Sequence, residues 1–345
     1  MGIRIASFNM HNISPKADRD LDRIAAIILG KRNHLSNGIE DNKPFDIVAM
    51  QEVLSEGRAI TGHMVKNVIA HRTALEKSLI WRLGKNWDAF WMSPRTHAKD
   101  ENEYDKRGEG YLFLWNTQKF ELLKDKDGNI IEPTIFQHYK TAPGMPRLIR
   151  DPLYGRFKIK HTKSELRLIT THIISGKPAN PLIPDVGTLI LRRNEFNILA
   201  GSIYKRISDY RKDINTTVPC TVILGDYNLN LASSDANNYK FDFPGEVACF
   251  DSKGYRVPIN SPNSTCIYTI QSEKTSLGDG HYANNFDHFS FDDDTRKIVV
   301  RCNQLDAVHS HEKPEDQTEE QKFARFKKEV SDHVPIILDI DLRKR

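Results

Sequence analysis

The sequence predicts a layered α/β fold with mixed β-sheets. Short strand-like runs alternate along the chain with segments of helical apolar spacing, without a strict strand–helix–strand order. The 345 residues are 39% hydrophobic, 28% charged and 9% aromatic, which is typical of a globular protein and excludes a disordered chain, a collagen or a coiled coil. The longest apolar run, Ile24–Leu29, is far shorter than the roughly 20 residues that cross a bilayer. We therefore expect no membrane span.

The first third of the chain predicts two strands and two helices. Ile3–Phe8 alternates with period two, as a half-buried strand does. A helix is expected next, because apolar residues recur at helical spacing: Leu21, Ile24, Ala25, Ile28 and Leu29. Gly30 would end this helix. A short apolar strand is expected at Asp46–Met50, and a long helix at about Ala59–Leu83.

The rest of the chain predicts six strands and one further long helix. The strands are expected at Tyr111–Trp115, Arg167–Ile174, Thr221–Leu224, Phe286–Phe291, Lys297–Arg301 and Val334–Ile340. The helix spans about Thr188–Arg211 and has one apolar face. The charge-rich segment His309–Lys328 is expected to be a solvated insertion that ends in a short helix. No linker and no repeat divides the sequence, so we expect a single domain over residues 1–345.

Charge and cysteine content say little about partners. Fifty basic and 46 acidic residues give a net charge of +4, which is weak support for a polyanionic partner. The four cysteines are scattered and form no C-x-x-C pair, so we expect reduced thiols and a cytoplasmic protein. No signal peptide is visible, although a secreted protein that has lost its leader would begin in the same way. No protein partner is predicted.

Polar residues that can bind a metal or move a proton recur where apolar strands end. They are Asn9, Gln51 and Glu52, His172, Asp226 and Asn228, Asp287 and His288, and Asp332 and His333. Each has an ordinary structural explanation when it is taken alone: a loop start, an Asx turn or a hydrogen-bonded core histidine. Their repeated position predicts that they converge on one edge of a sheet.

Several blocks of the sequence, taken in their order along the chain, resemble the endonuclease/exonuclease/phosphatase superfamily, and most of all its deoxyribonuclease I branch. The blocks are Arg4–Asn9, Asp46–Val53, Glu109–Trp115, Arg150–Pro152, Thr171–His172, Ile223–Asn228, Asn285–His288 and Ser331–Pro335. The resemblance covers essentially the whole chain. It implies a four-layer α/β/β/α sandwich of two packed mixed sheets flanked by helices, with insertions near 59–104, 271–283 and 304–328.

The resemblance also implies a magnesium site, for which Mn²⁺ could substitute. Its ligands would be Glu52, Asn9, Asp226, Asn228 and Asp332. Carboxylates and amide carbonyls are hard ligands that suit Mg²⁺. The chain offers no Cys ligands and no His-x-x-x-His pair, which argues against a zinc site.

Proton transfer would fall to two histidines, each oriented by a carboxylate. By resemblance the pairs are His172 with Glu109 and His333 with Asp287. Asp226 and Asn228 would complete the catalytic set, and Arg150 and Asn9 would contact the substrate phosphate. One imidazole would activate the attacking water and the other would assist the leaving oxygen. The sequence leaves open which imidazole does which.

Three functions are compatible with this pattern. The first is a Mg²⁺-dependent endonuclease that hydrolyses DNA with limited sequence specificity and leaves 5′-phosphate and 3′-hydroxyl ends, so that DNA is the expected partner. The alternative is a phosphatase or phosphodiesterase of the same superfamily that acts on a small or lipid-linked phosphate. Asn285–His288 departs from the inositol phosphatase pattern and counts against that branch. The third is an inactive binding module, against which the completeness of the site counts.

Overall fold

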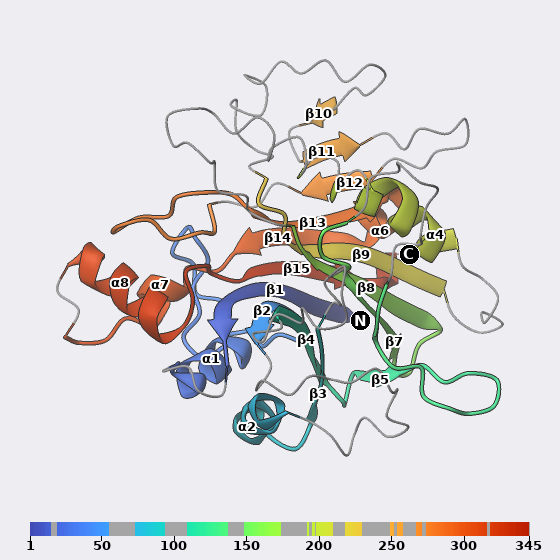
Figure 1. Cartoon of the computed structure of the whole chain (residues 1–345), viewed down its shortest axis with the longest axis horizontal. Coiled ribbons are helices and arrows are strands. Elements are labelled where there is room, and N and C mark those ends of the chain that lie inside the picture. Colours follow the sequence, from blue (N-terminus) through green and yellow to red (C-terminus); the bar gives the residue numbers. More distant parts are fainter. Residues whose placement is uncertain are drawn as a thin grey trace, which may run out of the picture.

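The computed structural model contains two mixed β-sheets that pack face to face (Figure 1). It describes residues 1–14, 19–54, 73–93, 109–136, 148–173, 192, 195–196, 198–209, 218–229, 249–251, 254–257, 267–270, 274–315 and 318–344. The first sheet has the spatial order β14 (Val299–Gln304), β15 (Ile336–Asp341), β1 (Gly2–Ile13), β2 (Ile47–Leu54), β4 (Glu109–Asn116) and β3 (Trp87–Met92).

The second sheet is longer. Its order is β10 (Cys249–Asp251), β11 (Gly254–Val257), β12 (Ile267–Ile270), β13 (Asp287–Asp292), β9 (Val218–Asp226), β8 (Ser164–His172), β7 (Leu153–Ile159) and β5 (Phe120–Leu122), while β6 (Thr134–Ile135) also pairs with β7. Among the described strands, β1 with β2 and β8 with β9 pair in parallel, and the other pairs are antiparallel.

Three apolar clusters separate the four layers. The central cluster fills the space between the sheets and contains Ile5, Phe113 and Leu224. A second cluster lies between the first sheet and the helices α1 (Leu21–Ile28), α2 (Ala74–Leu83), α7 (Ala307–Ser310) and α8 (Glu319–Glu329). The third packs the π-helical turn η2 (Ile198–Ile203) and α4 (Tyr204–Asp209) on the outer face of β8 and β9. The predicted α/β/β/α sandwich is therefore confirmed.

Strand β1 is buried on both faces. Ile3 and Ile5 belong to the cluster between the sheets, whereas Phe8 and Met10 pack under the helices. The prediction of a half-buried strand was wrong, because its polar residues are buried too. Arg4 is fully buried and forms ion pairs with carboxylates that neutralise it.

Two predicted elements begin elsewhere. The strand expected at Lys297–Arg301 starts at Val299, because the helix α6 (Asp293–Ile298) precedes it. Asp292 caps that helix and accepts a hydrogen bond from Thr295 N. The helix expected at Ala59–Leu83 is present as α2, which opens with a Thr73 capping box. Residues 55–72 lie outside the described residues, as do parts of the segment 188–211.

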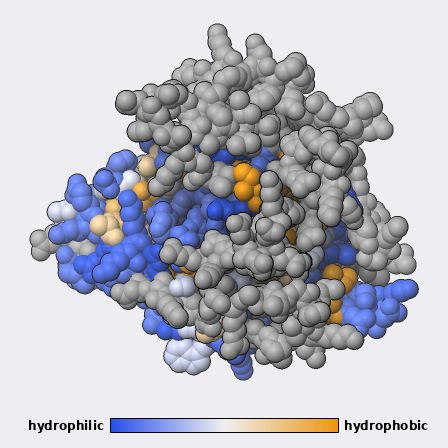
Figure 2. Space-filling model, in the orientation of Figure 1, coloured by the Kyte–Doolittle hydropathy of each residue, from blue (hydrophilic) through white to orange (hydrophobic). Residues whose placement is uncertain are grey.

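The segment expected to be a solvated insertion is only half solvated. Helix α8 buries Phe323 and Phe326 against the first sheet's helical layer, and Arg23 Cζ lies 5.0 Å from the centre of the Phe326 ring. Its outer surface is hydrophilic, as the left side of Figure 2 shows around α7 and α8. The insertions expected near 59–104, 271–283 and 304–328 stay predictions. In the described part of the chain, no helix is long and apolar enough to cross a membrane.

Candidate active site

The strand register of the second sheet brings three of the predicted site residues together. His172, the last residue of β8, is the Cα partner of Asp226 at the end of β9. Asp287 begins β13 and lies opposite Asp226 on its other side. Because the parallel strands β8 and β9 end at the same edge, residues far apart in sequence become neighbours.

The first sheet contributes Asn9 from β1 and Glu52 from β2, where the pairing of these two strands becomes irregular. Asn9 faces Gln51, and the register shifts just beyond this pair. Glu52 has a φ of 54°, which lies in the left-handed region that non-glycine residues rarely adopt. Asn9 Nδ2 donates hydrogen bonds to Glu52 Oε1 at 3.0 Å and to Asp226 Oδ2 at 2.9 Å. This single side chain therefore connects the two sheets at the site.

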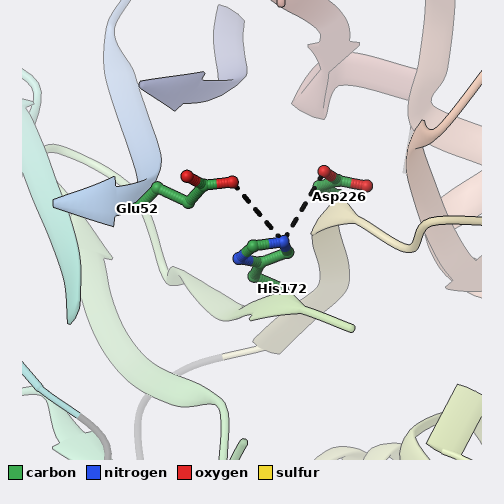
Figure 3. Close-up of side chains that lie close together, drawn as sticks. All are labelled: Glu52, His172 and Asp226. Carbon is green, nitrogen blue, oxygen red and sulfur yellow. Dashed lines mark ion pairs between the residues drawn. The ribbon is translucent and has the colours of Figure 1, made fainter. Parts of the chain in front are cut away.

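Glu52 and Asp226 lie on either side of the His172 imidazole (Figure 3). The Nε2 atom of His172 is 3.6 Å from Glu52 Oε1 and 3.8 Å from Asp226 Oδ2. Among the described residues, these three side chains could hold a metal ion, because one ligand atom of each lies within 4.8 Å of the others. Burial raises the pKa of the Asp226 carboxyl above its ordinary value, against the opposing effect of His333.

The His172 ring is held by Glu109, as the sequence predicted. Its Nδ1 is 2.5 Å from Glu109 Oε1. Burial lowers the pKa of His172, but the hydrogen bond that its ring donates to the Glu109 carboxylate outweighs this effect and the pKa is raised. Arg150 Nη2 forms an ion pair with Glu109 Oε2 at 2.7 Å. Arg150, which was predicted to contact the substrate phosphate, therefore lies at the site, and its guanidinium pairs there with a protein carboxylate.

The second predicted pair, His333 with Asp287, is also present. His333 Nδ1 lies 2.7 Å from Asp287 Oδ2, and its Nε2 lies 3.7 Å from Asp226 Oδ2. Burial opposes the charged ring, but the Asp287 carboxylate raises the pKa of His333 to about 10. Thr275 Oγ1 donates a hydrogen bond of 2.6 Å to the same Asp287 oxygen.

The two remaining predicted residues differ in their surroundings. Asn228 folds back on the site: its backbone N–H donates to Asp226 Oδ1 at 2.8 Å, and its Nδ2 donates to the Ile173 carbonyl oxygen at 2.7 Å. Asp332 Oδ2 lies 2.6 Å from His11 Nδ1. Its Oδ1 is buried without a hydrogen-bond partner in the described structure.

Sequence reasoning missed three residues of the site. His11 lies two positions beyond Asn9 and pairs with Asp332. Thr275 falls in a segment that the sequence assigned to an insertion, where no pattern marks it. Tyr111 OH accepts a hydrogen bond from the His172 backbone N–H at 3.1 Å. His11 extends the polar end of the first strand and Tyr111 lies in the block Glu109–Trp115, so both had a signal in the sequence.

The donor set fits a hard divalent cation. Glu52 Oε1 and Asp226 Oδ2 both accept a hydrogen bond from the Asn9 amide. Asp332 Oδ1 is buried, and no described residue donates a hydrogen bond to it. A cation of high charge density would satisfy these oxygens. In its present orientation Asn9 donates hydrogens to both carboxylates and accepts the His11 N–H on its own oxygen at 2.9 Å, so this amide organises the ligands.

Several solved structures have a similar fold. An endonuclease/exonuclease/phosphatase family protein from Bacteroides thetaiotaomicron superposes with a TM-score of 0.51 at 15% identity, covering 99% of each chain. ANGEL2, a 2′,3′-cyclic phosphatase bound to adenosine-2′,3′-vanadate, gives 0.51 at 12%, covering 99% of this chain and 96% of its own. A humanized D. rerio TDP2 gives 0.50 at 13%, covering 99% of each chain. No family model and no curated protein matches the sequence. The likeness confirms that this chain has the fold of the endonuclease/exonuclease/phosphatase superfamily.

Proposed function

We propose that this protein, whose fold is that of the endonuclease/exonuclease/phosphatase superfamily, is a Mg²⁺-dependent endonuclease that hydrolyses the phosphodiester bonds of DNA. The observation that carries the proposal is the placement of His172 and His333. Each is oriented by a carboxylate through Nδ1 and directs Nε2 at the same oxygen of Asp226. General acid–base chemistry at one phosphoryl group needs such an arrangement.

Individual side chains of the site would have the following roles in metal binding and proton transfer. Glu52, Asp226 and Asp332 would hold Mg²⁺, which neutralises charge on the phosphate oxygens when bound. Asp226 is the group that both imidazoles face, and it would accept the proton of the attacking water. His333, which its carboxylate partner keeps protonated, would donate a hydrogen bond to a phosphate oxygen. His172 would then protonate the leaving oxygen, giving 5′-phosphate and 3′-hydroxyl products.

Residues around this centre hold the groups in position. Glu109 fixes the His172 ring through Nδ1 and is itself paired with Arg150. When substrate enters, Arg150 would exchange part of that pairing for the phosphate, for which its planar guanidinium is suited. Asn228 orients Asp226 through its backbone N–H. The choice of DNA rests on the blocks that resemble the deoxyribonuclease I branch, Glu109–Trp115 and Arg150–Pro152.

A second candidate is a phosphatase or phosphodiesterase for a small or lipid-linked phosphate. It is favoured by the fold likeness to ANGEL2, which is a 2′,3′-cyclic phosphatase and was solved with adenosine-2′,3′-vanadate. Both candidates use the same acid–base groups, so they differ in the substrate and not in the centre. The cytoplasmic location expected from the cysteines stays a proposal.

A substrate panel distinguishes the two candidates. Purified protein is incubated with supercoiled plasmid, with adenosine 2′,3′-cyclic phosphate, and with inositol phosphates, in Mg²⁺ and in EDTA. The endonuclease proposal predicts plasmid nicking that EDTA abolishes and that Glu52→Gln reduces by about 10²-fold or more. Glu121→Gln is the control, because Glu121 pairs with Lys158 on the exposed surface. Intact plasmid with turnover of a small phosphate would favour the second candidate instead.

A further inference from the structure

One helical turn outside the catalytic centre reaches two loops of the site. Arg192 and Glu195 both have a helical backbone and stand three positions apart, so their side chains lie on the same face of the turn. Arg192 Nη1 donates a hydrogen bond to the Asn228 carbonyl oxygen at 2.6 Å. Glu195 Oε1 accepts a hydrogen bond from the Ile149 backbone N–H at 2.9 Å. The turn therefore binds the main chain at Asn228 and directly before Arg150.

Packing anchors this turn on the second sheet. Phe196, the residue after Glu195, is buried in the third apolar cluster, and its ring centre lies 5.1 Å from that of Tyr227. Tyr227 directly follows Asp226, the last residue of β9. Glu195 itself is 3% exposed. Its side chain therefore extends from a backbone that is anchored next to the catalytic centre.

The buried Glu195 carboxyl lies within electrostatic reach of the site. A carboxylate is unfavourable in such a place unless other groups compensate its charge, and burial raises the pKa of Glu195 to about 7. The Ile149 N–H and the charges of Arg150 and His172 oppose this rise, whereas the charge of Asp151 adds to it. The acid–base steps proposed above do not use this carboxyl group.

The position of Arg150 depends on the residue before it. The Ile149 side chain is 40% exposed, so packing holds this residue weakly and the hydrogen bond from its N–H to Glu195 becomes important. From this position Arg150 Nη1 lies 2.8 Å from His172 Nδ1, and Arg150 Nη2 lies 2.7 Å from Glu109 Oε2. A shift of residue 149 would move the guanidinium relative to both side chains.

We propose that Glu195 is a positioning residue for Arg150: by binding the Ile149 N–H, its carboxylate fixes the place from which the guanidinium contacts the substrate phosphate. The inference deepens the proposed function and rests on it, because the phosphate contact of Arg150 is part of that function. The contact depends on geometry, since a planar guanidinium binds phosphate through two parallel hydrogen bonds. A displacement of about 1 Å can slow an enzymatic reaction by about 10²-fold.

The first measurement needs no substrate. Amide hydrogen exchange of Ile149 is followed by nuclear magnetic resonance in the full chain labelled with ¹⁵N-isoleucine. We expect this N–H to exchange about 10-fold faster in Glu195→Met, because one hydrogen bond is lost. It should stay protected in Glu195→Gln, whose amide oxygen can still accept. Glu76→Met is the matched control, since Glu76 is also 3% exposed and accepts the Trp91 N–H at 2.9 Å; it should leave the exchange of Ile149 unchanged.

The second measurement is a double-mutant cycle on the rate of hydrolysis, with plasmid or with the small phosphate that is turned over. If Glu195 acts through Arg150, Glu195→Met should slow hydrolysis by up to about 10²-fold on its own and should add nothing in the Arg150→Ala background. Glu195→Gln should restore most of the rate. Any effect of Glu76→Met should be the same in both backgrounds.

Three results would overturn the inference. They are an Ile149 N–H that exchanges as an unprotected amide in the unaltered protein, an Ile149 N–H that stays protected in Glu195→Met, and an equal slowing by Glu195→Met with and without Arg150. Failure of the proposed function looks different, because unaltered protein would then hydrolyse no substrate. Exchange that depends on Glu195 would in that case still support the placement of residue 149 by this carboxylate.

Discussion

His172 and His333 direct their Nε2 atoms at one oxygen atom, Asp226 Oδ2, from 3.8 Å and 3.7 Å. The two rings come from different sheets, since His172 ends β8 and His333 precedes β15. The Asp226 carboxylate therefore lies next to one histidine from each sheet region. The Asp226 side chain is buried beside these two imidazoles.

Replacing this carboxylate by an amide of the same shape should remove activity and keep the fold. We expect Asp226→Asn to lower the initial rate of plasmid nicking by about 10²- to 10⁴-fold, because the amide cannot accept the proton of water. Circular dichroism should be unchanged. Asp294→Asn is the control, since Asp294 is exposed and pairs with Lys297. A nicking rate within threefold of that of the unaltered protein would contradict the role given to Asp226.

The glycine before Asp226 is required by the close approach of two strands. Gly225 has a φ of 142°, and a Cβ atom added there would lie 2.0 Å from the Thr171 carbonyl oxygen. Gly225→Ala should therefore destabilise the protein by more than about 1 kcal/mol and shift Asp226 away from His172. The control is Gly128→Ala, where φ is also positive at 83° but where an added Cβ would meet nothing within 4 Å. Urea unfolding should rank Gly225→Ala clearly below Gly128→Ala; equal midpoints would contradict the steric argument.

The buried arginine of β1 should be essential for stability. Arg4 is fully buried and pairs with Asp41 and Asp339, each at 2.9 Å. In Arg4→Met both buried carboxylates lose one partner and keep Arg301, and breaking a buried pair in this way costs up to about 3–5 kcal/mol. The comparison is Arg343→Met, which removes an exposed pair with Asp341 and should leave the urea midpoint unchanged. If both variants unfold at the same urea concentration as the unaltered protein, the buried network is not stabilising.

A histidine outside the site should make stability depend on pH. Hydrogen bonds to Asp306 and then to Glu319 raise the pKa of His309 to about 9. The folded state therefore binds the proton more tightly than the unfolded chain, whose histidine has a pKa near 6.5. The stabilisation is complete below about pH 6.5 and is lost as the pH rises towards 9. His309→Gln should unfold at a lower urea concentration than the unaltered protein at pH 6, and the difference should vanish at pH 9.5. A difference that is the same at both pH values would contradict this assignment.

Much of the site could be predicted, because several of its residues directly follow apolar runs in the sequence. Asn9, His172 and Asp226 each close an apolar run, and parallel strands bring such ends to a common edge. The left-handed backbone of Glu52 and the register shift beside it could not be predicted, because they depend on pairing between β1 and β2. His11 was overlooked although it extends the polar end of the first strand, because its position is set by a hydrogen bond from Arg19 and by one that it donates to Asn9.

The errors in the fold have local causes. The strand β14 begins later than predicted because the helix that Asp292 caps continues through Lys297 and Ile298. The segment containing α8 was expected to be solvated because charges dominate its composition. Its two buried aromatic residues, Phe323 and Phe326, stand three positions apart. Residues at this spacing lie on the same face of a helix, where they can pack together against the core.

The most direct test of the central claim is the rate of plasmid nicking by His172→Ala as a function of Mg²⁺ concentration. We expect the unaltered protein to nick plasmid only with added Mg²⁺, and His172→Ala to be about 10²- to 10⁴-fold slower at every concentration. His161→Ala, which alters an exposed histidine, should behave like the unaltered protein. Nicking by His172→Ala at the unaltered rate, or nicking that persists in EDTA, would contradict the claim that these side chains act together on one metal-bound phosphodiester.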